Sequence, residues 1–411
     1  MTPRRTAPNA SAAAPTTRTK DPMNASTMNA SKSAKLSAVA KLSPLAALES
    51  ELNASFPERR EVIRALLTAA VAGENAFMLG APGTAKSNLA RVLAGAFQAS
   101  YFEYLMTRFT EPSELFGPVD PSAFRAGKYA RVTANKFPEA EVVFLDEVWK
   151  ANSAIANSLL TALNERTFDS GSGPVRIPLL TCIGASNELR ESAELDAIYD
   201  RFLVRLVTDY IVEDSNFLGL LTSVANGTRT SVLAKVDIRA EQAAAKTVTV
   251  TSDTLDAIVA LRAACKAAGM VVSDRRWVQC LSLVRAAAHL DGRTATETED
   301  LEVLESVLWR KPDERVAVAR TIQSTVSPDG ARAVEELDAA RELVRRLPVF
   351  GNVDRKTFLC AVSEAGDALD KISDRLAGLK SGRKVDAAKI EVAAMQQDVG
   401  RSAYKASGFK A

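Results

Sequence analysis

The sequence has few of the residues that build several common kinds of site. It contains one histidine, His289, and four cysteines, Cys182, Cys265, Cys280 and Cys360, with no Cys-x-x-Cys pair. Histidine-rich metal sites, Ser/His/Asp triads and disulfide frameworks therefore do not fit this chain. No stretch approaches the roughly 18 consecutive apolar residues of a membrane-spanning helix, so no transmembrane segment is expected. Cysteines this sparse are typical of a reducing compartment, and we expect a cytoplasmic protein.

Length and composition predict a globular protein of two or three domains. The 411 residues are 47% hydrophobic and 25% charged. Residues 1–44 hold seven basic residues and one acidic residue, Asp21, with almost no large apolar side chains. Such a segment cannot offset its ordering entropy, so we expect a disordered basic tail, in which Met23 and Met28 are alternative starts. A transit peptide is disfavoured because the basic residues do not recur on an amphipathic face.

The rest of the chain is not basic. It holds 45 of the 52 basic residues and 49 of the 50 acidic residues, and aromatic residues make up only 6% of the whole sequence. A groove for nucleic acid is typically lined by basic and aromatic side chains. The composition therefore makes nucleic acid an unlikely partner.

The strongest local pattern is an apolar run, a glycine-containing loop and a helical pattern. Residues 76–79 predict a strand, and Leu89, Val92 and Leu93 follow the loop with helical spacing. In such a loop the backbone N–H groups cradle phosphates, the lysine reaches the β- and γ-phosphates, and the serine binds Mg²⁺. The sequence therefore predicts a nucleotide site. The loop residues are Gly80, Ala81, Pro82, Gly83, Thr84, Ala85, Lys86 and Ser87.

Ala85 departs from the usual G-x-x-x-x-G-K-[ST] pattern, which has glycine before the lysine. A methyl group is tolerated there if the backbone has right-handed helical angles, although it narrows the approach of the phosphate.

Polar residues follow two further apolar runs. Residues 142–145 read as a buried strand that ends in Asp146 and Glu147, about 60 residues after the loop. Asp146 is predicted to hold Mg²⁺ through water, and Glu147 to orient and activate the attacking water. A third strand, residues 179–184, comes shortly before Asn187. Asn187 can hydrogen-bond the γ-phosphate and the attacking water, although asparagine is also an ordinary turn residue.

These runs, with residues 101–106 and 202–207, predict an α/β fold. We expect an open five-stranded parallel sheet with helices on both faces and a site at the carboxyl ends of the strands.

Taken in order, GAPGTAKS, VVFLDE, GASNE, YDRF and SDRR resemble the motifs of a MoxR-family AAA+ ATPase. Within that family the sequence is most similar to the RavA subgroup, through EYLMTRF, FPEAEVVFLDEVWKA, LLTALNER, ASNEL and VSDRRW. The similarity covers roughly residues 45–310. It implies an AAA+ P-loop NTPase core, ATP and Mg²⁺ as cofactors, ATP hydrolysis, and assembly into a hexameric ring. An alanine before the motif lysine is familiar in this subgroup.

The resemblance also implies roles for single residues. It makes Asn187 the first sensor, Arg201 the arginine finger and Arg275 the second sensor, with Arg205 and Arg276 as the respective alternatives. A finger supplies positive charge to the neighbouring subunit's γ-phosphate as negative charge develops there. The ordinary interpretation of Arg201 is a charge on a surface helix, and that of Arg275 or Arg276 is a salt bridge at the start of a helix.

Family members carry two insertions that face the ring pore or a partner. Here one falls within residues 111–138, where residues 127–132 look hairpin-like, and the other spans residues 168–177. We single out Tyr129 as an aromatic residue that would grip a substrate or partner. Either insertion is equally consistent with an inert surface hairpin.

Helical patterns dominate the second half of the chain. Trp277, Cys280, Leu281, Val284 and Ala288 recur on one face of a helix, which places His289 beside packed side chains as a structural residue. Heptad-like spacing over residues 362–379 and 385–399 predicts an antiparallel helical hairpin at about residues 358–402, with packing on the lid as the alternative. The expected parts are a tail (1–44), an αβα core (45–225), a connector (226–251), an all-α lid (252–320) and a C-terminal helical region (321–411).

Three functions are compatible with these features. The resemblance implies a chaperone-like ATPase that remodels, matures or assembles partner protein complexes, together with a protein that carries a von Willebrand factor A domain. The alternative is a nucleic-acid-associated AAA+ motor or loader. A nucleotide-binding scaffold without turnover is third, because every catalytic element is present in the sequence.

Overall fold

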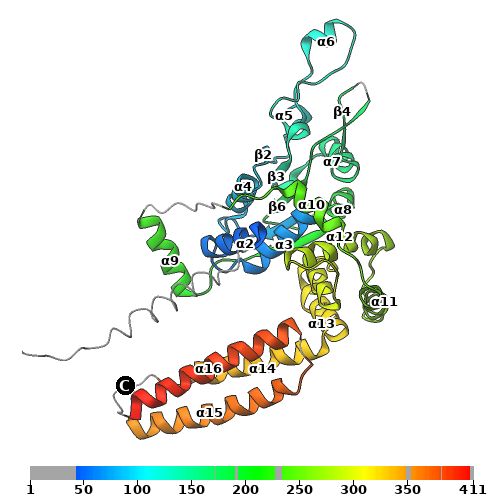
Figure 1. Cartoon of the computed structure of the whole chain (residues 1–411). Helices are drawn as coiled ribbons and strands as arrows, with labels where there is room; N and C mark the ends of the chain where they lie inside the picture. The colour runs from blue at the N-terminus through cyan, green and yellow to red at the C-terminus, as the bar shows by residue number, and fades with distance from the viewer. Residues whose placement is uncertain are drawn as a thin grey trace, which may run out of the picture. The chain divides into compact units, whose positions relative to one another are not determined.

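The computed structural model describes residues 43–171, 173–189, 193–226, 234–348, 353–380 and 382–407 (Figure 1). Nearly all of the expected basic tail lies outside the described residues. Within those residues, no helix has both the length and the apolar character that crossing a membrane requires.

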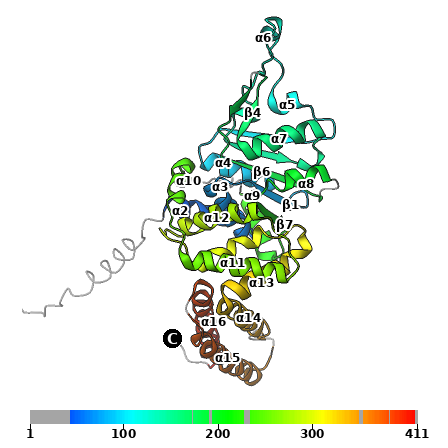
Figure 2. The same ribbon diagram turned by 90° about the vertical axis from the view of Figure 1, so that its right-hand side faces the viewer.

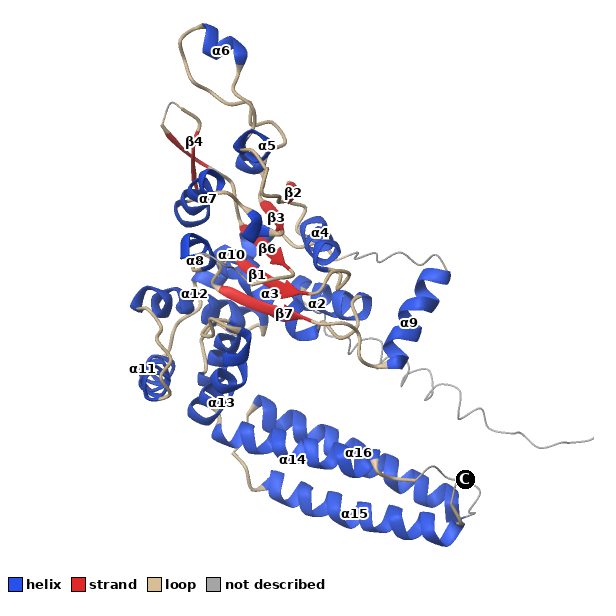
Figure 3. Cartoon of the chain, turned by 180° about the vertical axis from the view of Figure 1, so that it is seen from behind, coloured by secondary structure: helices blue, strands red, loops and turns tan. Residues whose placement is uncertain are grey.

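A five-stranded parallel sheet forms the centre of the core, and this part of the sequence prediction is confirmed. The strand order is β2-β3-β6-β1-β7, and the strands lie side by side in Figure 3. The inner strands β1, β3 and β6 bury nearly every side chain, which explains their continuous apolar runs. The strands are β1 (Ala76–Gly80), β2 (Tyr101–Leu105), β3 (Val142–Asp146), β6 (Thr181–Ser186) and β7 (Val204–Thr208).

Helices cover both faces of the sheet. Met78, Phe144 and Ile183 pack with the apolar residues of α2, α3 and α4. Phe77 and Val143, which are neighbours of these residues in the strands, pack instead with α7 and α8. This alternation gives the three-layer α/β fold that the sequence predicts. The helices are α2 (Pro44–Ser55), α3 (Arg60–Ala72), α4 (Lys86–Ala96), α7 (Ser153–Glu165) and α8 (Ala193–Tyr199).

The two expected insertions differ in structure. The first contains two short helices and a 3-10 turn, and its residues 127–132 form no hairpin, because only an isolated bridge joins Val119 to Arg131. The second forms a small antiparallel hairpin. The elements are α5 (Pro112–Phe116), α6 (Pro121–Arg125), η1 (Phe137–Glu139), β4 (Thr167–Asp169) and β5 (Pro174–Arg176). A further 3-10 turn, η2 (Val148–Lys150), follows β3.

Helices continue from β7 to residue 326. The segment expected to be a connector contains α10, whose Ile238 and Ala245 are buried, so it is part of the packed structure. Nε2 of His289 lies at hydrogen-bond distance, 2.6 Å, from the Glu241 carboxylate of α10. This contact between two helices is consistent with a structural role for His289. The elements are α9 (Asp214–Ala225), α10 (Ile238–Lys246), α11 (Ser252–Ala267), α12 (Asp274–Leu290), η3 (Thr298–Ser306), η4 (Pro312–Glu314) and α13 (Arg315–Val326).

The last three helices form a bundle, shown in Figure 2. Helices α15 (Arg355–Ala377) and α16 (Arg383–Ser407) pack together through the heptad-like residues. A third helix, α14 (Pro328–Arg345), completes the apolar core with Ala333, Leu337 and Ala340. The sequence pattern indicated only a pair of helices, because the seam of α14 consists mostly of small alanine side chains.

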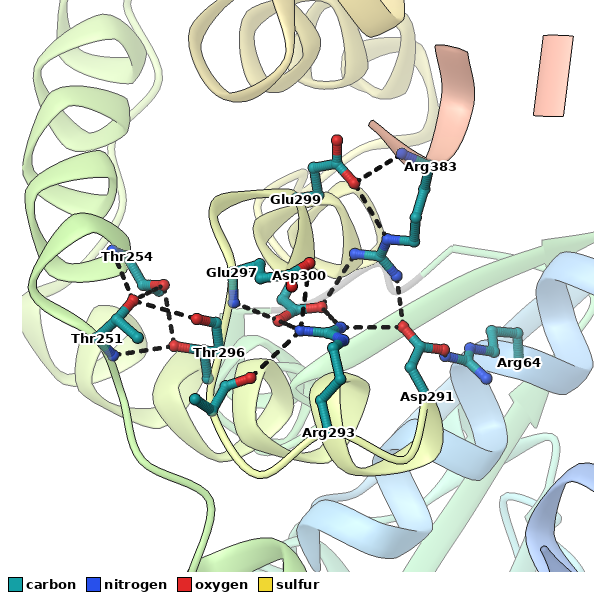
Figure 4. A network of polar contacts seen from close by, with 11 residues as sticks. Arg64, Thr251, Thr254, Asp291, Arg293, Thr296, Glu297, Glu299, Asp300 and Arg383 are labelled. Carbon is teal, nitrogen blue, oxygen red and sulfur yellow. Dashed lines mark hydrogen bonds and ion pairs between the residues drawn. The ribbon is translucent and has the colours of Figure 1, made fainter. Parts of the chain in front are cut away.

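An ion-pair network, which we call the α16 junction, joins this bundle to the lid and to α3 (Figure 4). Arg383 contacts Asp291 at 2.6 Å, Asp300 at 2.9 Å and Glu299 at 3.3 Å. The side chain of Asp300 is fully buried, and Arg293 also contacts it at 2.8 Å. Asp291 in turn pairs with Arg64 of α3. Because a buried carboxylate is costly without partners, this network fixes the start of α16 against the lid.

Candidate nucleotide site

The loop between β1 and α4 leaves room and unpaired donors for an anion. A Cβ atom at Gly80 would lie 2.2 Å from the Thr208 carbonyl oxygen, so the close approach of β7 requires glycine there. Gly83 has a φ of +83°, and a Cβ atom there would meet nothing within 4 Å. Helix α4 has no side-chain cap at its amino end. Its first N–H groups and the open loop therefore suit a phosphate.

Ala85 does not have the right-handed backbone that the sequence interpretation required. Its φ is +66° and its ψ is +21°, which is the left-handed region. A side chain in this region costs roughly 1 kcal/mol or more, because Cβ approaches the following carbonyl oxygen. The expectation for Ala85 was therefore wrong, and the loop holds a strained residue at the point where related loops use glycine.

Lys86 is held inside the loop by oxygen atoms. Its Nζ atom donates to the carbonyl oxygens of Gly80 at 2.7 Å and Ala81 at 2.9 Å, and to Oδ1 of Asn187 at 3.3 Å. Only 7% of the residue is exposed. Burial lowers the pKa of Lys86, while the charges of Asp146 and Glu147 oppose that shift. A bound anion would therefore stabilise the charged form of this partly buried ammonium group.

Two carboxylates follow β3 beside this lysine. Burial raises the pKa of Asp146, and its Oδ1 accepts the Glu147 N–H at 3.0 Å. Glu147 adopts a left-handed turn with a φ of +52°, which directs the chain out of the strand. Its Oε1 accepts Nδ2 of Asn187 at 2.8 Å, and Lys150 lies 3.4 Å from its other oxygen.

The predicted residues therefore meet at one edge of the sheet. The order β3-β6-β1 brings the carboxyl ends of three strands together, and a continuous chain of contacts runs from Lys86 through Asn187 to Glu147. Ser87 lies next to Lys86 in the first turn of α4. Among the described residues no cluster of three or more His, Cys, Asp or Glu side chains could hold a metal alone. Ser87 and Asp146 fit Mg²⁺ that is bound mainly through phosphates and water.

Arg201 and Arg275 lie at the opposite end of β7 from this edge. Arg275 forms an ion pair with Asp200, the residue before Arg201. Burial lowers the pKa of Arg201, and the positive charge of Arg275 lowers it further. The Nε atom of Arg201 is buried without a hydrogen-bond partner among the described residues. Thr208, which lies beside the loop, is five residues after Leu203, a distance of about 16 Å along a strand. Neither arginine therefore reaches the phosphate edge of its own chain.

The alternative arginines are committed to structural contacts. Arg205 is 2% exposed, lies over the Tyr199 ring at 3.9 Å and donates to the Trp309 carbonyl oxygen. Arg276 is 6% exposed, pairs with Asp200 at 2.9 Å and donates to three carbonyl oxygens. Burial lowers the pKa of Arg276. Arg201 and Arg275 are consequently the more exposed member of each pair.

Tyr129 lies in the first insertion and touches the second. Its side chain is 44% exposed, and Arg131 lies 5.6 Å from its ring centroid. A Cβ atom at Gly171, in the β4–β5 loop, would be 2.1 Å from the Tyr129 ring, so the two insertions are in close contact. Tyr129 is thus partly exposed and braced by both insertions.

The structure also shows contacts that sequence reasoning missed. Trp149, two residues after Glu147, packs against Phe77, Tyr199 and Phe202, with ring centroids 4.8 to 6.2 Å apart. This aromatic cluster joins the strand that enters the phosphate loop to the residues that flank Arg201. The only signal was the presence of aromatic residues beside the DE and DR motifs. The Tyr210 hydroxyl, which donates to the Pro82 carbonyl oxygen at 3.2 Å, had no signal.

The sheet order, the phosphate loop and the polar strand ends define an AAA+ nucleotide-binding fold with a helical lid. A family model described as the MoxR domain in MoxR-vWA-beta-propeller ternary systems matches residues 43–247, and one described as an AAA lid domain matches residues 253–322. The chain belongs to the MoxR family of AAA+ ATPases.

Relatives and solved structures are consistent with this assignment. Two uncharacterized proteins of Methanocaldococcus jannaschii are 36% and 35% identical, over 75% and 73% of this chain and 82% and 79% of their own lengths. The crystal structure of a candidate ATPase from Cytophaga hutchinsonii is similar with a TM-score of 0.55 and 17% identity. It covers 72% of this chain and 98% of the other, and this likeness concerns the fold alone.

Proposed function

We propose that this chain hydrolyses ATP at the Lys86–Asn187–Glu147 edge and uses the energy to remodel, mature or assemble partner protein complexes. The observation that carries the proposal is the unbroken contact chain between the phosphate-binding lysine and the carboxylate. Backbone N–H groups of residues 80–85 and Lys86 would bind the phosphates of ATP. Glu147, positioned by Asn187, would accept a proton from the attacking water. Mg²⁺, held by Ser87 and through water by Asp146, would neutralise phosphate charge.

We further propose that Arg201 and Arg275 act on the nucleotide of a neighbouring subunit. Both lie at the far end of β7 from their own phosphate loop, and Arg201 has a buried Nε atom without a partner among the described residues. A cation placed beside the γ-phosphate is a large source of rate in phosphoryl transfer. A trans-acting pair requires a neighbouring subunit, and the family similarity supports a hexameric ring.

The name of the matching family model supports a partner protein with a von Willebrand factor A domain. The model is described for systems that combine MoxR, a von Willebrand factor A domain and a β-propeller. We propose that a protein with a von Willebrand factor A domain works with this chain, that the action is chaperone-like as in the RavA subgroup, and that Tyr129 contacts the partner. The braced, half-exposed position of Tyr129 between the two insertions is compatible with that role.

An ATP-trapped pull-down tests the function. Glu147→Gln keeps the hydrogen bond from Asn187 but removes the base, so a ring bound to ATP should stay on its client. After nuclease treatment, mass spectrometry should find one protein assembly that includes a von Willebrand factor A protein. The same assembly should be lost in a Lys86→Ala control at an ATP concentration below its raised Kd. Recovery only of nucleic-acid-binding proteins, abolished by nuclease, would instead support the motor or loader function.

A further inference from the structure

The backbone of Arg201 is fixed at both of its polar groups. Residues 199–202 lead from the end of α8 toward β7, and we call them the finger turn. The Arg201 N–H donates to the Ile198 carbonyl oxygen at 2.9 Å, and the Arg201 carbonyl oxygen accepts Nδ2 of Asn75 at 3.1 Å. The guanidinium differs, because its Nε atom is buried without a hydrogen-bond partner among the described residues. The chain therefore holds Arg201 by its backbone and leaves hydrogen-bond capacity on its side chain.

Asn75 is the buried residue that joins the finger turn to the sheet. It lies directly before β1 and is 2% exposed. Its Nδ2 atom also donates to the Leu163 carbonyl oxygen at 3.4 Å, while Oδ1 accepts Nη1 of Arg166 at 3.0 Å and the Cys182 N–H at 3.1 Å. Two donors meet Oδ1 and two carbonyl oxygens meet Nδ2, so the network determines the orientation of the amide. A buried amide used at both ends holds the surrounding elements in one arrangement.

Aromatic packing anchors the residues on either side of Arg201. Tyr199 and Phe202 are 1% and 0% exposed, and the Trp149 ring centroid lies 5.7 and 6.2 Å from theirs. A Cβ atom at Gly184 of β6 would lie 2.8 Å from the Phe202 ring, so the absence of a side chain there makes room for this ring. The finger turn is thus packed into the core through the two residues that flank Asp200 and Arg201.

The two anchors of the finger turn are next to the nucleotide site of the same chain. Asn75 directly precedes the strand that enters the phosphate loop. Trp149 lies in η2, two residues after Glu147, and its ring centroid is 4.8 Å from that of Phe77 in β1. The elements that carry a subunit's own phosphate loop and carboxylate therefore also determine where its Arg201 lies.

We propose that Asn75 and Trp149 are positioning residues for Arg201, which hold its guanidinium where it reaches the γ-phosphate of the neighbouring subunit. This inference rests on the proposed action of Arg201 on that neighbour. Asn75 fixes the turn through the Arg201 carbonyl oxygen, and Trp149 fixes it through the rings on either side. A catalytic group displaced by about 1 Å can lose roughly 10²-fold in rate, so such anchors matter without touching the substrate.

Mixtures of two chains isolate this role. A site chain carries Arg201→Ala and keeps an intact nucleotide site, while a finger chain carries Lys86→Ala and keeps Arg201. At ATP concentrations below the raised Kd of the finger chain, hydrolysis comes from site chains that receive Arg201 from a finger chain. Asn75→Asp or Trp149→Leu is then placed in the finger chain alone. Any effect of these substitutions on that chain's own Glu147 does not contribute to the measured rate.

The substitutions are chosen to spare the fold. Asn75→Asp has the same shape and still accepts hydrogen bonds from its two donor partners, but it can no longer donate to the Arg201 carbonyl oxygen. Trp149→Phe keeps an aromatic ring and is the conservative counterpart of Trp149→Leu. Phe97→Leu is the matched control, because Phe97 is a buried aromatic residue that packs on the other face of the sheet.

The finger-chain substitutions should lower kcat and leave KM unchanged, because the site chain that binds ATP is unaltered. Asn75→Asp should lower the kcat of the mixture by about 10 to 100-fold, and Trp149→Leu by about 3 to 10-fold. Trp149→Phe, which retains the ring contacts, and Phe97→Leu should stay within about twofold of the unsubstituted finger chain. Asn75→Asp moved to the site chain, which has no Arg201 to position, should have a much smaller effect.

The outcomes separate this inference from the proposed function. Full recovery of hydrolysis with Asn75→Asp and Trp149→Leu in the finger chain would overturn the inference and leave the action of Arg201 on its neighbour intact. An equal loss with Asn75→Asp in either chain would assign Asn75 to folding and overturn its role. No recovery with the unsubstituted finger chain would overturn the action of Arg201 and this inference with it. Mass measurement checks that each variant enters the mixed assembly, and if Asn75→Asp does not, Trp149→Leu against Trp149→Phe decides.

Discussion

Basic side chains hold together both the nucleotide edge, where Lys86, Asn187 and Glu147 meet, and the α16 junction. The partners of these basic side chains differ in kind between the two regions. Lys86 contacts carbonyl oxygens five and six residues before it, within one loop. Arg383 contacts carboxylates that lie 83 to 92 residues away. Backbone geometry fixed by adjacent residues produces a recognisable motif, whereas distant ion pairs leave no local pattern.

The two regions should also respond differently to mutation. At the nucleotide edge most of the proposed contacts form only with a bound nucleotide, so side-chain changes should alter affinity and turnover more than folding. At the α16 junction the contacts are complete without a ligand, so changes should alter stability alone. Each of the following substitutions either breaks or sharpens this contrast.

The largest effect is expected for Glu147→Gln. The amide cannot accept a proton, so ATP hydrolysis should fall by about 10² to 10⁴-fold while ATP binding and Tm stay close to the wild type. Steady-state phosphate release and nucleotide titration measure the two quantities. Glu188→Gln, an exposed neighbour of Asn187, should retain full activity. Equal hydrolysis in wild type and Glu147→Gln would remove Glu147 from the role of base.

Lys86→Ala should weaken binding itself. Hydrogen bonds from a charged donor contribute roughly 1.5 to 3 kcal/mol, so the Kd for ATP should rise by about 10 to 100-fold. Isothermal titration with the wild type and with Lys128→Ala, which removes an exposed lysine from the first insertion, provides the comparison. Unchanged affinity in Lys86→Ala would mean that the loop does not bind the phosphates.

Arg383→Ala should lower stability and leave nucleotide affinity unchanged. Asp300 keeps Arg293 as a partner, and Arg383 is itself 42% exposed, so the expected loss is only about 1 to 2 kcal/mol. This corresponds to a decrease in Tm of roughly 2 to 8 °C. Arg341→Ala, which breaks an exposed pair with Glu391 inside the bundle, should change Tm by less. A changed Kd for ATP in Arg383→Ala would contradict the separation of the two regions.

Ala85→Gly should have the smallest effect. Relief of the left-handed strain, about 1 kcal/mol, is largely offset by the roughly 0.5 to 1 kcal/mol entropic cost of glycine. Ala81→Gly, in the same loop but without a positive φ, should incur only the cost. Differential scanning calorimetry should therefore find Ala85→Gly the more stable of the two variants. The reverse order would show that Ala85 is not strained.

The sequence predicted the parts of the molecule whose physics is local. Continuous apolar runs located the three inner strands, β1, β3 and β6, because inner parallel strands are buried on both faces. Strand ends placed Lys86, Asp146, Glu147 and Asn187 together, because parallel strands end at one edge. Sequence reasoning failed where contacts are distant or depend on backbone angles, as at Arg383, in the aromatic cluster around Trp149, and at Ala85. It also missed α10, which buries only Ile238 and Ala245, and it did not resolve α14 within the predicted C-terminal helical region, because small residues make up most of the buried face of that helix.

The central claim is that ATP is hydrolysed between two subunits, and mixing two inactive chains tests it most directly. Lys86→Ala lacks the phosphate-binding lysine but retains Arg201, and Arg201→Ala has the reverse defect. If Arg201 acts on the neighbouring nucleotide, ATP hydrolysis by the Arg201→Ala chain alone should be reduced by roughly 10³-fold or more. Hydrolysis by the Lys86→Ala chain alone should be low at ATP concentrations below its raised Kd, and an equimolar mixture should recover a substantial fraction of wild-type hydrolysis. Arg201→Ala mixed with the Arg201→Ala/Lys86→Ala double variant serves as the control, because neither chain then supplies the cation. A mixture no more active than the sum of its parts would contradict hydrolysis between subunits.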